Sequence, residues 1–510
     1  MTELAANLQK FDEYVNSVFQ SWDIPGMAVA VVKDGEVVFA KGYGVRELGS
    51  DTPVDAETVF AIGSASKAFT AAALAMLVDE GKLKWDDLAS KYLPDLRLFD
   101  PYVTANLTVR DLVTHRSGLA RTDFLWYGQS HARQEILKRV RHIEPASSFR
   151  SAFGYQNVLY LAAGEIIPAV TGLSFDEFIH DRFFKPLGMP SSNTSTNDLK
   201  SVENQATPHI KVGDTVKVIN WRNIDNVAPA GSINSNVTDM ANWVKLQLTE
   251  GKFNGEQLLS PASLKESHSP QFIIRPDGEF DLIWQVCPDM NFMTYGLGWF
   301  VQDYKGRKVV HHGGNIDGMA AHVSLIPSEK VGVVILTNLN AAVLPMVLHF
   351  SLFDAILGGG NRDWSDHALK LKATLDQSVK DAGAQQAKSR VRGTQTSLGM
   401  DSYTGEYIHP AYDPIQVAFE GEGLVMTAGA GLVGDLTHWH FDTFAVDWRD
   451  PVFAGPGDIK QLVTFVLNAD GKVAEVKTPL MGDFKRNPAP AAPTAEGLET
   501  AASVQAIEEV

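Results

Sequence analysis

Ser64 and Lys67 form the one Ser-x-x-Lys sequence in the chain, where a strand-like stretch gives way to an apolar helical pattern. Three residues span nearly one helical turn, so the serine Oγ and the lysine Nζ can share a face within hydrogen-bond reach. A serine hydroxyl is a poor nucleophile near pH 7, but a lysine desolvated between helices can lose its proton and act as its base. The helix N-terminus would also point backbone N–H groups at an anion formed beside Ser64. The alternative is a helix-capping serine with an unrelated lysine one turn later.

Tyr155 and Asn157 form a second candidate, a Tyr-x-Asn sequence that follows Gly154 and opens the apolar helical pattern Val158–Ile167. At a helix entrance the phenol can project into a cleft, and the Asn157 amide can donate to a substrate carbonyl. The pattern alone is weak, because Tyr14-Val15-Asn16 repeats it. The alternative is an aromatic side chain that packs under the helix.

A third candidate lies between two strand-like runs, where His311 and His312 precede Gly313 and Gly314. Consecutive glycines in a strand indicate close approach by a ligand or another backbone. The histidines could donate a hydrogen bond or a proton, or they could be structural residues or metal ligands. Because no carboxylate or cysteine cluster accompanies them, we expect no metal and no cofactor.

Composition and missing motifs exclude several other classes. The 510 residues carry a net charge of −17, which disfavours nucleic acids and anionic membranes as partners. The chain has no phosphate-binding loop, no His-Glu-x-x-His and no Gly-x-Ser-x-Gly. A Gly-x-Gly-x-x-Gly at residues 429–434 stands among short strand-like runs, so we interpret it as turn glycines. The lone Cys287, an N-terminus without a signal-peptide pattern and the short apolar run Ala71–Val78 favour a cytoplasmic protein.

The element pattern predicts an α+β fold for residues 1–362. A helix is expected over Leu4–Gln20, followed by a hairpin of Met27–Val32 and Glu36–Ala40 joined at Asp34-Gly35. Helical signals then dominate from about residue 64, with the clearest helix at Ala65–Glu80. Strand-like runs return at Tyr295–Val301, Val309–His312, Ala320–Ile326 and Val331–Thr337, before a helix near Leu344–Leu357. Strands from both ends must pair to bury their faces, so we expect one antiparallel sheet with an inserted helical lobe.

The remainder of the chain changes character after residue 362. Residues 363–395 are predicted to form a helical linker, and residues 396–485 a small all-β barrel or sandwich, with strand-like runs at 403–407, 415–419, 423–427, 438–444 and 461–467. Residues 486–510, rich in Ala, Pro, Glu and Thr, are predicted to be a disordered tail.

In this order the three motifs resemble the serine β-lactamase and penicillin-binding-protein superfamily, most closely its class C-like branch of esterases, D-aminopeptidases and related peptidases. The resemblance covers about residues 10–358. Supporting stretches are Asp79–Leu83, Asp111–Leu119, Pro186–Met189, Pro229–Ser232, Asp239–Ala241 and Tyr295–Trp299. The β-rich C-terminal domain resembles, more weakly, the lipocalin-like modules of some family peptidases, which can shape the cleft or the oligomer. The resemblance implies no cofactor, and a homo-oligomer through the C-terminal domain is one expectation.

The resemblance implies that Ser64 is the acylated nucleophile, Lys67 the base and Tyr155 the proton relay. Asn157 would hold a substrate carbonyl, and the backbone N–H groups of Ser64 and Asn315 would form the oxyanion hole.

His312, Gly313 and Gly314 stand where lactamases and DD-peptidases of this superfamily generally carry Lys-Thr-Gly. The motif offers neither a permanent charge nor a hydroxyl, although a histidine with an ordinary pKa of about 6.5 would become cationic in mild acid. We therefore expect a serine hydrolase that cleaves an amide or ester, in a small peptide or another small molecule. The alternatives are a β-lactamase or D-Ala-D-Ala carboxypeptidase, and an inactive family member that serves as a binding or scaffolding protein.

Overall fold

The structure is a computed structural model that describes residues 3–276, 281–358, 360, 362–429, 431–455, 459–479 and 481–488. These residues divide into two compact units, one built chiefly from residues 3–382 and the other from residues 383–488. The tail predicted at 486–510 lies outside the described residues from position 489 onward.

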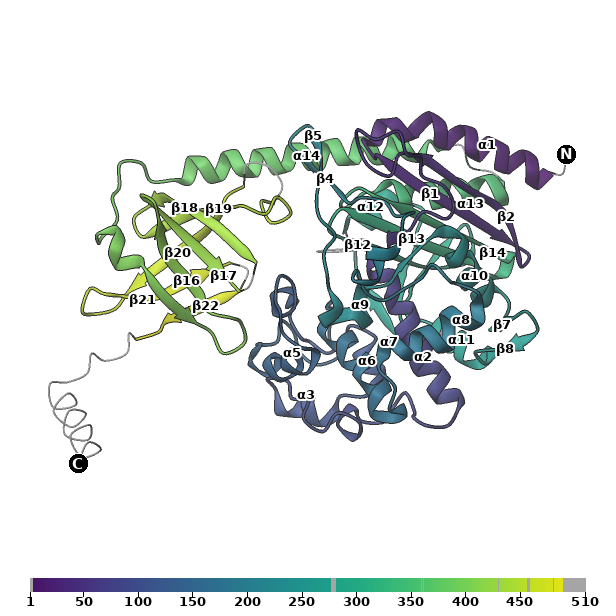
Figure 1. Cartoon of the computed structure of the whole chain (residues 1–510), viewed down its shortest axis with the longest axis horizontal. Helices are drawn as coiled ribbons and strands as arrows, with labels where there is room; N and C mark the ends of the chain where they lie inside the picture. The colour runs from purple at the N-terminus through teal and green to yellow at the C-terminus, as the bar shows by residue number, and fades with distance from the viewer. Residues whose placement is uncertain are drawn as a thin grey trace, which may run out of the picture. The chain divides into compact units, whose positions relative to one another are not determined.

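An eight-stranded antiparallel sheet forms the centre of the first unit, in the order β2-β1-β14-β13-β12-β11-β10-β9 (Figure 1). Its strands are β1 (Gly26–Lys33), β2 (Glu36–Gly44), β9 (Phe272–Ile274), β10 (Met293–Tyr295), β11 (Phe300–Tyr304), β12 (Arg307–Ile316), β13 (Met319–Ile326) and β14 (Val331–Thr337). The first hairpin pairs with the last strand, so β1 lies between β2 and β14. This confirms that strands from both ends of the unit share one antiparallel sheet.

The β1–β2 hairpin turns at Asp34 and Gly35, where φ is 54° and 83°. Two consecutive positive φ values match the right-handed twist of the strands, and Asp-Gly tolerates them.

Both faces of the central strands are buried, which explains why their sequences are continuously apolar. Met27, Val29 and Val31 of β1 share a hydrophobic core with α1 (Glu3–Val18) and α13 (Leu344–Leu357). On the opposite face α10 (Val237–Leu248) packs against β1 and β14, so closely that a Cβ built on Gly332 would lie 2.5 Å from Val244 Cγ1. The sheet is therefore a middle layer between helices.

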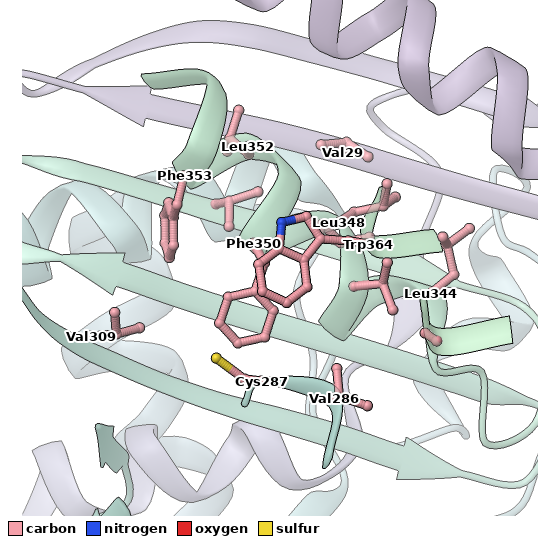
Figure 2. Packing of buried hydrophobic residues seen from close by; sticks show 14 of the residues in the cluster. Val29, Val286, Cys287, Val309, Leu344, Leu348, Phe350, Leu352, Phe353 and Trp364 are labelled. Atoms are coloured by element: carbon pink, nitrogen blue, oxygen red, sulfur yellow. The ribbon is translucent and has the colours of Figure 1, made fainter. Parts of the chain in front are cut away.

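The core between the sheet and α13 combines aliphatic and aromatic side chains (Figure 2). Phe350 stacks on Trp364, with ring centroids 4.8 Å apart, and Cys287 belongs to the same buried cluster. Burial raises the pKa of the Cys287 thiol to about 12. Trp364 begins α14 (Trp364–Ser389), so the first turn of the helix predicted as a linker is anchored in this core.

The segment between β2 and β9 forms a helical lobe, in which α2 (Ser66–Asp79) packs against α6 (Val158–Thr171), α9 (Ala228–Gly231) and α11 (Pro261–Ser267). Smaller elements are α3 (Pro101–Asn106), α4 (Val109–Leu112), α5 (Arg133–Arg139), α7 (Phe175–Ile179), α8 (Lys185–Leu187), α12 (Asp281–Val286) and the strand pairs β3–β6 (Phe60–Ala61, Asn234–Ser235), β4–β5 (His209–Val212, Thr215–Val218) and β7–β8 (Lys252–Phe253, Glu256–Gln257). Within the described ranges no single helix is long and apolar enough to cross a membrane. Val158–Thr171 and Phe175–Leu187 pass that test only as a pair, which is bent by 82°.

The second unit is a closed antiparallel barrel of eight strands: β15 (Gly405–Ile408), β16 (Ile415–Glu420), β17 (Gly423–Ala428), β18 (Leu432–His440), β19 (Thr443–Trp448), β20 (Gln461–Leu467), β21 (Val473–Thr478) and β22 (Gly482–Arg486). Pairing of β15 with β22 closes it. The buried rings of Tyr403, Phe444 and Phe465 meet at centroid distances of 5.1–5.5 Å. A closed barrel leaves no sheet edge unpaired.

Several expected strands are wrong in detail. The run Tyr295–Val301 is not one strand, because β10 ends at Tyr295 and β11 begins at Phe300 after a turn in which Gly298 has a φ of 79°. The run 438–444 likewise crosses the tip of the β18–β19 hairpin. In both cases apolar turn residues imitate a strand. Among the glycines at 429–434, Gly434 lies within β18, packed against Val446, rather than in a turn.

Candidate active site

Ser64 lies in a 3₁₀ turn, Gly63–Ala65, which we call the Ser64 turn, directly before α2. Lys67, on the first turn of α2, is completely buried, whereas Ser64 is half-buried. Lys67 Nζ lies 3.0 Å from Ser64 Oγ, 2.7 Å from Asn157 Oδ1 and 2.8 Å from the Ala230 carbonyl oxygen. The spacing of the first motif therefore places the amine beside the hydroxyl, as the sequence predicts.

Burial sets the protonation of this amine. Desolvation lowers the pKa of Lys67 well below its ordinary value, with Asp123 opposing the shift and Arg121 adding to it. A neutral amine has two hydrogens and one lone pair. Oδ1 of Asn157 and the Ala230 carbonyl can only accept, so they take the two hydrogens. The lone pair of the neutral amine is then left facing the Ser64 hydroxyl.

Asn157 stands at the N-terminal end of α6, and both ends of its amide are engaged. Its Oδ1 accepts from Lys67, and its Nδ2 donates to Asp123 Oδ1 at 2.8 Å. Asp123 also accepts from Trp126 Nε1 at 3.1 Å and from Arg121 Nε at 2.7 Å. One Nδ2 hydrogen remains for the substrate contact that the resemblance implies.

Tyr155 lies two residues before Asn157, at the entrance to α6, as the sequence predicts. Its ring centroid is 4.9 Å from Lys67 Nζ and 5.7 Å from the Arg121 guanidinium. The buried ring of His115 packs against it, with centroids 4.3 Å apart. These contacts place the Tyr155 ring beside the Lys67 amine.

The third motif closes the opposite side of the Ser64 turn. β11 pairs with β12 from Arg307 to His311, whereas β13 pairs with β12 as far as Ile316. The Ser64 turn packs against this part of β12. A Cβ built on Gly314 would lie 1.8 Å from the Ile62 carbonyl oxygen and 3.0 Å from Ser64 N, and one on Gly63 would lie 2.7 Å from Asn315 N. The glycines are thus required by backbone-to-backbone contact, which packs the Ser64 turn directly against Gly314 and Asn315.

His312 and His311 point to opposite faces of β12, as neighbours in a strand must. His312 Nε2 lies 3.0 Å from the Tyr295 hydroxyl, and its Nδ1 lies 2.6 Å from the Gly313 carbonyl oxygen. Burial, with repulsion from Lys67, lowers the pKa of His312 to about 3. The expectation that His312 becomes cationic in mild acid is therefore wrong, because the sequence does not reveal its complete burial.

Asp123 and the Ala230 carbonyl are the groups that sequence analysis missed. Ala230 lies within a supporting stretch of the resemblance, but a carbonyl carries no residue-type signal. Asp123 belongs to no motif, and only folding places it beside Asn157. Arg116 and Arg150, two other arginines of the lobe, both pair with the buried carboxylate of Asp111, at 2.7 and 2.6 Å.

His311 lies in the core, where its ring stacks on Phe300 and His322 at centroid distances of 5.5 and 5.3 Å. Within the described part of the chain, no group of three or more His, Cys, Asp or Glu side chains is placed to hold a metal ion.

Similarity to known protein families covers both units of the chain. Residues 9–347 match the Beta-lactamase family, and residues 389–491 match a domain of unknown function, DUF3471. The chain is 29% identical to "Unguisins hydrolase ungD'" of Aspergillus campestris over 433 residues, which cover 81% of this chain and 78% of that one. It is 24% identical to "Protein flp" of Staphylococcus aureus over 344 residues, 67% of this chain and 65% of that one.

The fold is also similar to that of a solved octameric penicillin-binding protein homologue from Pyrococcus abyssi, with a TM-score of 0.62 and 20% identity over 94% of this chain and 98% of that one. The first unit has the sheet and the inserted helical lobe expected of the superfamily. The chain belongs to the Beta-lactamase family, whose members include serine hydrolases.

Proposed function

We propose that the protein is a serine hydrolase that forms an acyl-enzyme on Ser64 and cleaves an amide or ester bond of a small peptide or similar molecule. The observation that carries the proposal is the environment of Lys67: a fully buried amine with two carbonyl acceptors and Ser64 Oγ in reach. A structural lysine would have a carboxylate partner or reach solvent. The contacts of Lys67 instead leave the lone pair of a neutral amine available to take the proton of the Ser64 hydroxyl.

In the proposed reaction Lys67 Nζ takes the Ser64 proton while Oγ attacks the substrate carbonyl carbon. The carbonyl oxygen becomes an oxyanion, held by the N–H groups of Ser64 and Asn315. Tyr155 passes a proton to the leaving amine or alcohol as the carbon–leaving-group bond breaks. Water then attacks the ester on Ser64 and loses a proton to Tyr155, and Lys67 returns its proton to Ser64 Oγ as the acid is released. Each role rests on groups that the chain itself supplies.

A general amide or ester substrate is favoured over a β-lactam or a D-Ala-D-Ala peptide. The third motif contributes a neutral His312 whose ring nitrogens contact Tyr295 and Gly313. It provides no fixed cation for the carboxylate that penicillins and D-Ala-D-Ala peptides carry. The similarity to proteins named unguisins hydrolases supports hydrolysis as the reaction class.

Covalent labelling tests the proposal directly. A fluorophosphonate probe should add one adduct, located on Ser64 by intact-mass and peptide mass spectrometry, and Ser64→Ala should lose both the adduct and turnover. An unlabelled native chain would support the alternative of an inactive binding protein. Turnover of nitrocefin at rates matching those of simple esters would favour the β-lactamase alternative.

A further inference from the structure

Asp123 occupies a position from which it decides how the catalytic amide of Asn157 is oriented. We propose that Asp123 is a positioning residue, which locks the Asn157 side chain with its oxygen toward Lys67 and so keeps the Lys67 lone pair on Ser64. The inference rests on the proposed role of Lys67 as the base.

The argument begins with the symmetry of a side-chain amide. Its oxygen and nitrogen have nearly the same shape, so asparagine can present either end to Lys67, and the surrounding hydrogen bonds decide which. A carboxylate is acceptor-only. Asp123 Oδ1, 2.8 Å from Asn157 Nδ2, therefore accepts only the amide nitrogen, and the oxygen must face Lys67 Nζ at 2.7 Å.

The opposite orientation would disable the amine. With Nδ2 toward Lys67, the amide would donate to the lysine lone pair, which is the electron pair needed to accept the Ser64 proton. A donor in that place also disfavours a protonated Lys67, so the amine could not hold the proton once it had taken it. The orientation of Asn157 thus has a consequence at Ser64 Oγ, 3.0 Å from Nζ.

Asp123 is itself fixed on both oxygens. Trp126 Nε1, a group that can only donate, contacts Oδ1 at 3.1 Å, and Arg121 Nε contacts Oδ2 at 2.7 Å. Trp126 is 7% exposed, so the indole is held by packing. The carboxylate therefore cannot rotate away without leaving a buried donor unpaired.

Two variants separate the hydrogen bond that Asp123 accepts from Asn157 from the negative charge of Asp123. In Asp123→Ala no acceptor remains for Asn157 Nδ2, so the amide is free to turn. In Asp123→Asn the new carbonyl oxygen can still accept from Asn157 and Trp126, with its amino group toward the solvent side, where Arg121 is 49% exposed and can move. Asp123→Ala therefore removes the hydrogen bond that orients Asn157, and Asp123→Asn removes only the negative charge.

The readout is the second-order rate constant for labelling of Ser64 by a fluorophosphonate, measured against pH in the full chain. Asp123→Ala should label about tenfold more slowly than wild type, and Asp123→Asn should stay within about twofold. Asp176→Ala, which breaks a comparable pair with Arg133 at 2.9 Å outside the site, is the matched control and should label at the wild-type rate.

The pH profile adds a signature that a merely structural role would not produce. The titratable and charged groups that the structure places around Lys67 are Tyr155, Tyr160, His115, His312, Arg121 and Asp123. Because Asp123 raises the pKa of Lys67, the acid limb of the profile should move to lower pH in Asp123→Asn while its plateau is kept.

The inference would be overturned if Ser64 in Asp123→Ala were labelled at the wild-type rate. It would also be overturned if Asp123→Asn lost as much of the labelling rate as Asp123→Ala. Should Asp123→Ala fail to fold, Asp123→Ser, whose hydroxyl is too short to reach Asn157, carries the same expectation. Failure of the proposed function is distinguishable, because wild type itself would then show no adduct on Ser64.

Discussion

Two buried nitrogen bases lie in the candidate site, and they differ in the groups that they contact. Lys67 belongs to the first turn of α2 and His312 to β12, and burial lowers the pKa of both. Lys67 contacts two carbonyl oxygens and the Ser64 hydroxyl, so its lone pair has a reactive partner. The ring nitrogens of His312 contact Tyr295 and the Gly313 carbonyl. Burial favours the neutral form of each base, but the neighbouring donors and acceptors decide whether its lone pair can take part in chemistry.

The α2 side and the β12 side of the site also differ in what their backbones supply. On the α2 side the proposed base is the side chain of Lys67, and the backbone contributes the N–H of Ser64, one of the two proposed oxyanion donors. On the β12 side the essential feature is the backbone of Gly314 and Asn315, pressed against Ile62 and Ser64. The comparison predicts that substitutions on the α2 side remove a reacting group. Substitutions on the β12 side should instead act by displacing the backbone from the Ser64 turn.

Lys67 should give the largest loss. Lys67→Ala removes the proposed base, and we expect kcat/KM for an ester probe such as p-nitrophenyl butyrate to fall by about 10³–10⁴-fold. Lys67→Arg is the sharper test, because a guanidinium keeps a nitrogen donor in place but cannot be deprotonated, so it offers no lone pair for the Ser64 proton. Both variants should be equally inactive, with far-UV circular dichroism unchanged. Appreciable turnover by Lys67→Arg would contradict the role of the amine as a base.

Tyr155 should rank next. Tyr155→Phe keeps the ring, whose centroid lies 4.3 Å from that of His115, and deletes only the hydroxyl that we propose as the proton carrier. We expect kcat to fall by about 10²–10³-fold in the same ester assay. Tyr92→Phe, which removes a hydroxyl bonded to Asp87 at 2.6 Å outside the site, should be unaffected. If Tyr155→Phe retained full activity, proton relay would have to pass through another group.

Substitutions at Gly313 and Gly314 test the β12 side of the site. A Cβ at Gly314 would meet the Ile62 carbonyl oxygen at 1.8 Å, whereas one at Gly313 would meet nothing nearer than 3.6 Å. Gly314→Ala must push β12 from the Ser64 turn, so we expect about a hundredfold loss of kcat/KM. Gly313→Ala should stay within a few-fold of wild type. Equal effects of the two substitutions would show that the close approach is not what the motif provides.

Much of this arrangement is predictable from sequence because its causes are local. The Ser-x-x-Lys spacing fixes the face that Ser64 and Lys67 share, and Asp34-Gly35 fixes the hairpin that joins the sheet. The covered faces of β1 and β14 make their sequences uniformly apolar, so these strands are easy to recognise.

The rest is not predictable because it depends on contacts between distant segments. Asp123 reaches Asn157 across 34 residues, and the Ala230 carbonyl reaches Lys67 across 163. Neither carries a spacing signal. The protonation of His312 depends on burial between β11, β13 and the lobe, which no local pattern encodes, and so its expected charge in mild acid was wrong.

The neutral state of three stacked core histidines, from β12, β13 and α13, can be tested through stability alone. His311, His322 and His349 stack in the core, with His322 and His349 centroids 4.5 Å apart, and burial lowers the pKa of His311 to about 3. The unfolded chain, with histidine pKa near 6.5, then binds more protons between about pH 6.5 and 3, so the free energy of unfolding falls as pH falls.

Each such histidine should cost about 1.4 kcal/mol per pH unit below about pH 6.5. Urea unfolding at pH 7.5 and 5.5 measures the difference. His349→Phe should reduce it by about one histidine's share, and His180→Gln, at a side chain 64% exposed, should leave it unchanged. An undiminished pH dependence in His349→Phe would show that these rings are not held neutral.

The smallest effect is expected at His312 itself. With a pKa of about 3, its ring stays neutral from pH 5 to 8, so it gives no pH-dependent attraction for a substrate carboxylate. Two substrates with one acyl group, one ending in a carboxylate and one in an amide, should show a ratio of kcat/KM values that stays constant over that range. The ratio cancels the titration of Lys67, which both substrates require, and His312→Gln should leave it unchanged. A preference for the free acid that grows below pH 6.5 and disappears in His312→Gln would mean that His312 titrates in the cleft. Lys67 and His312 would then differ less in their ability to take up a proton than their hydrogen bonds indicate.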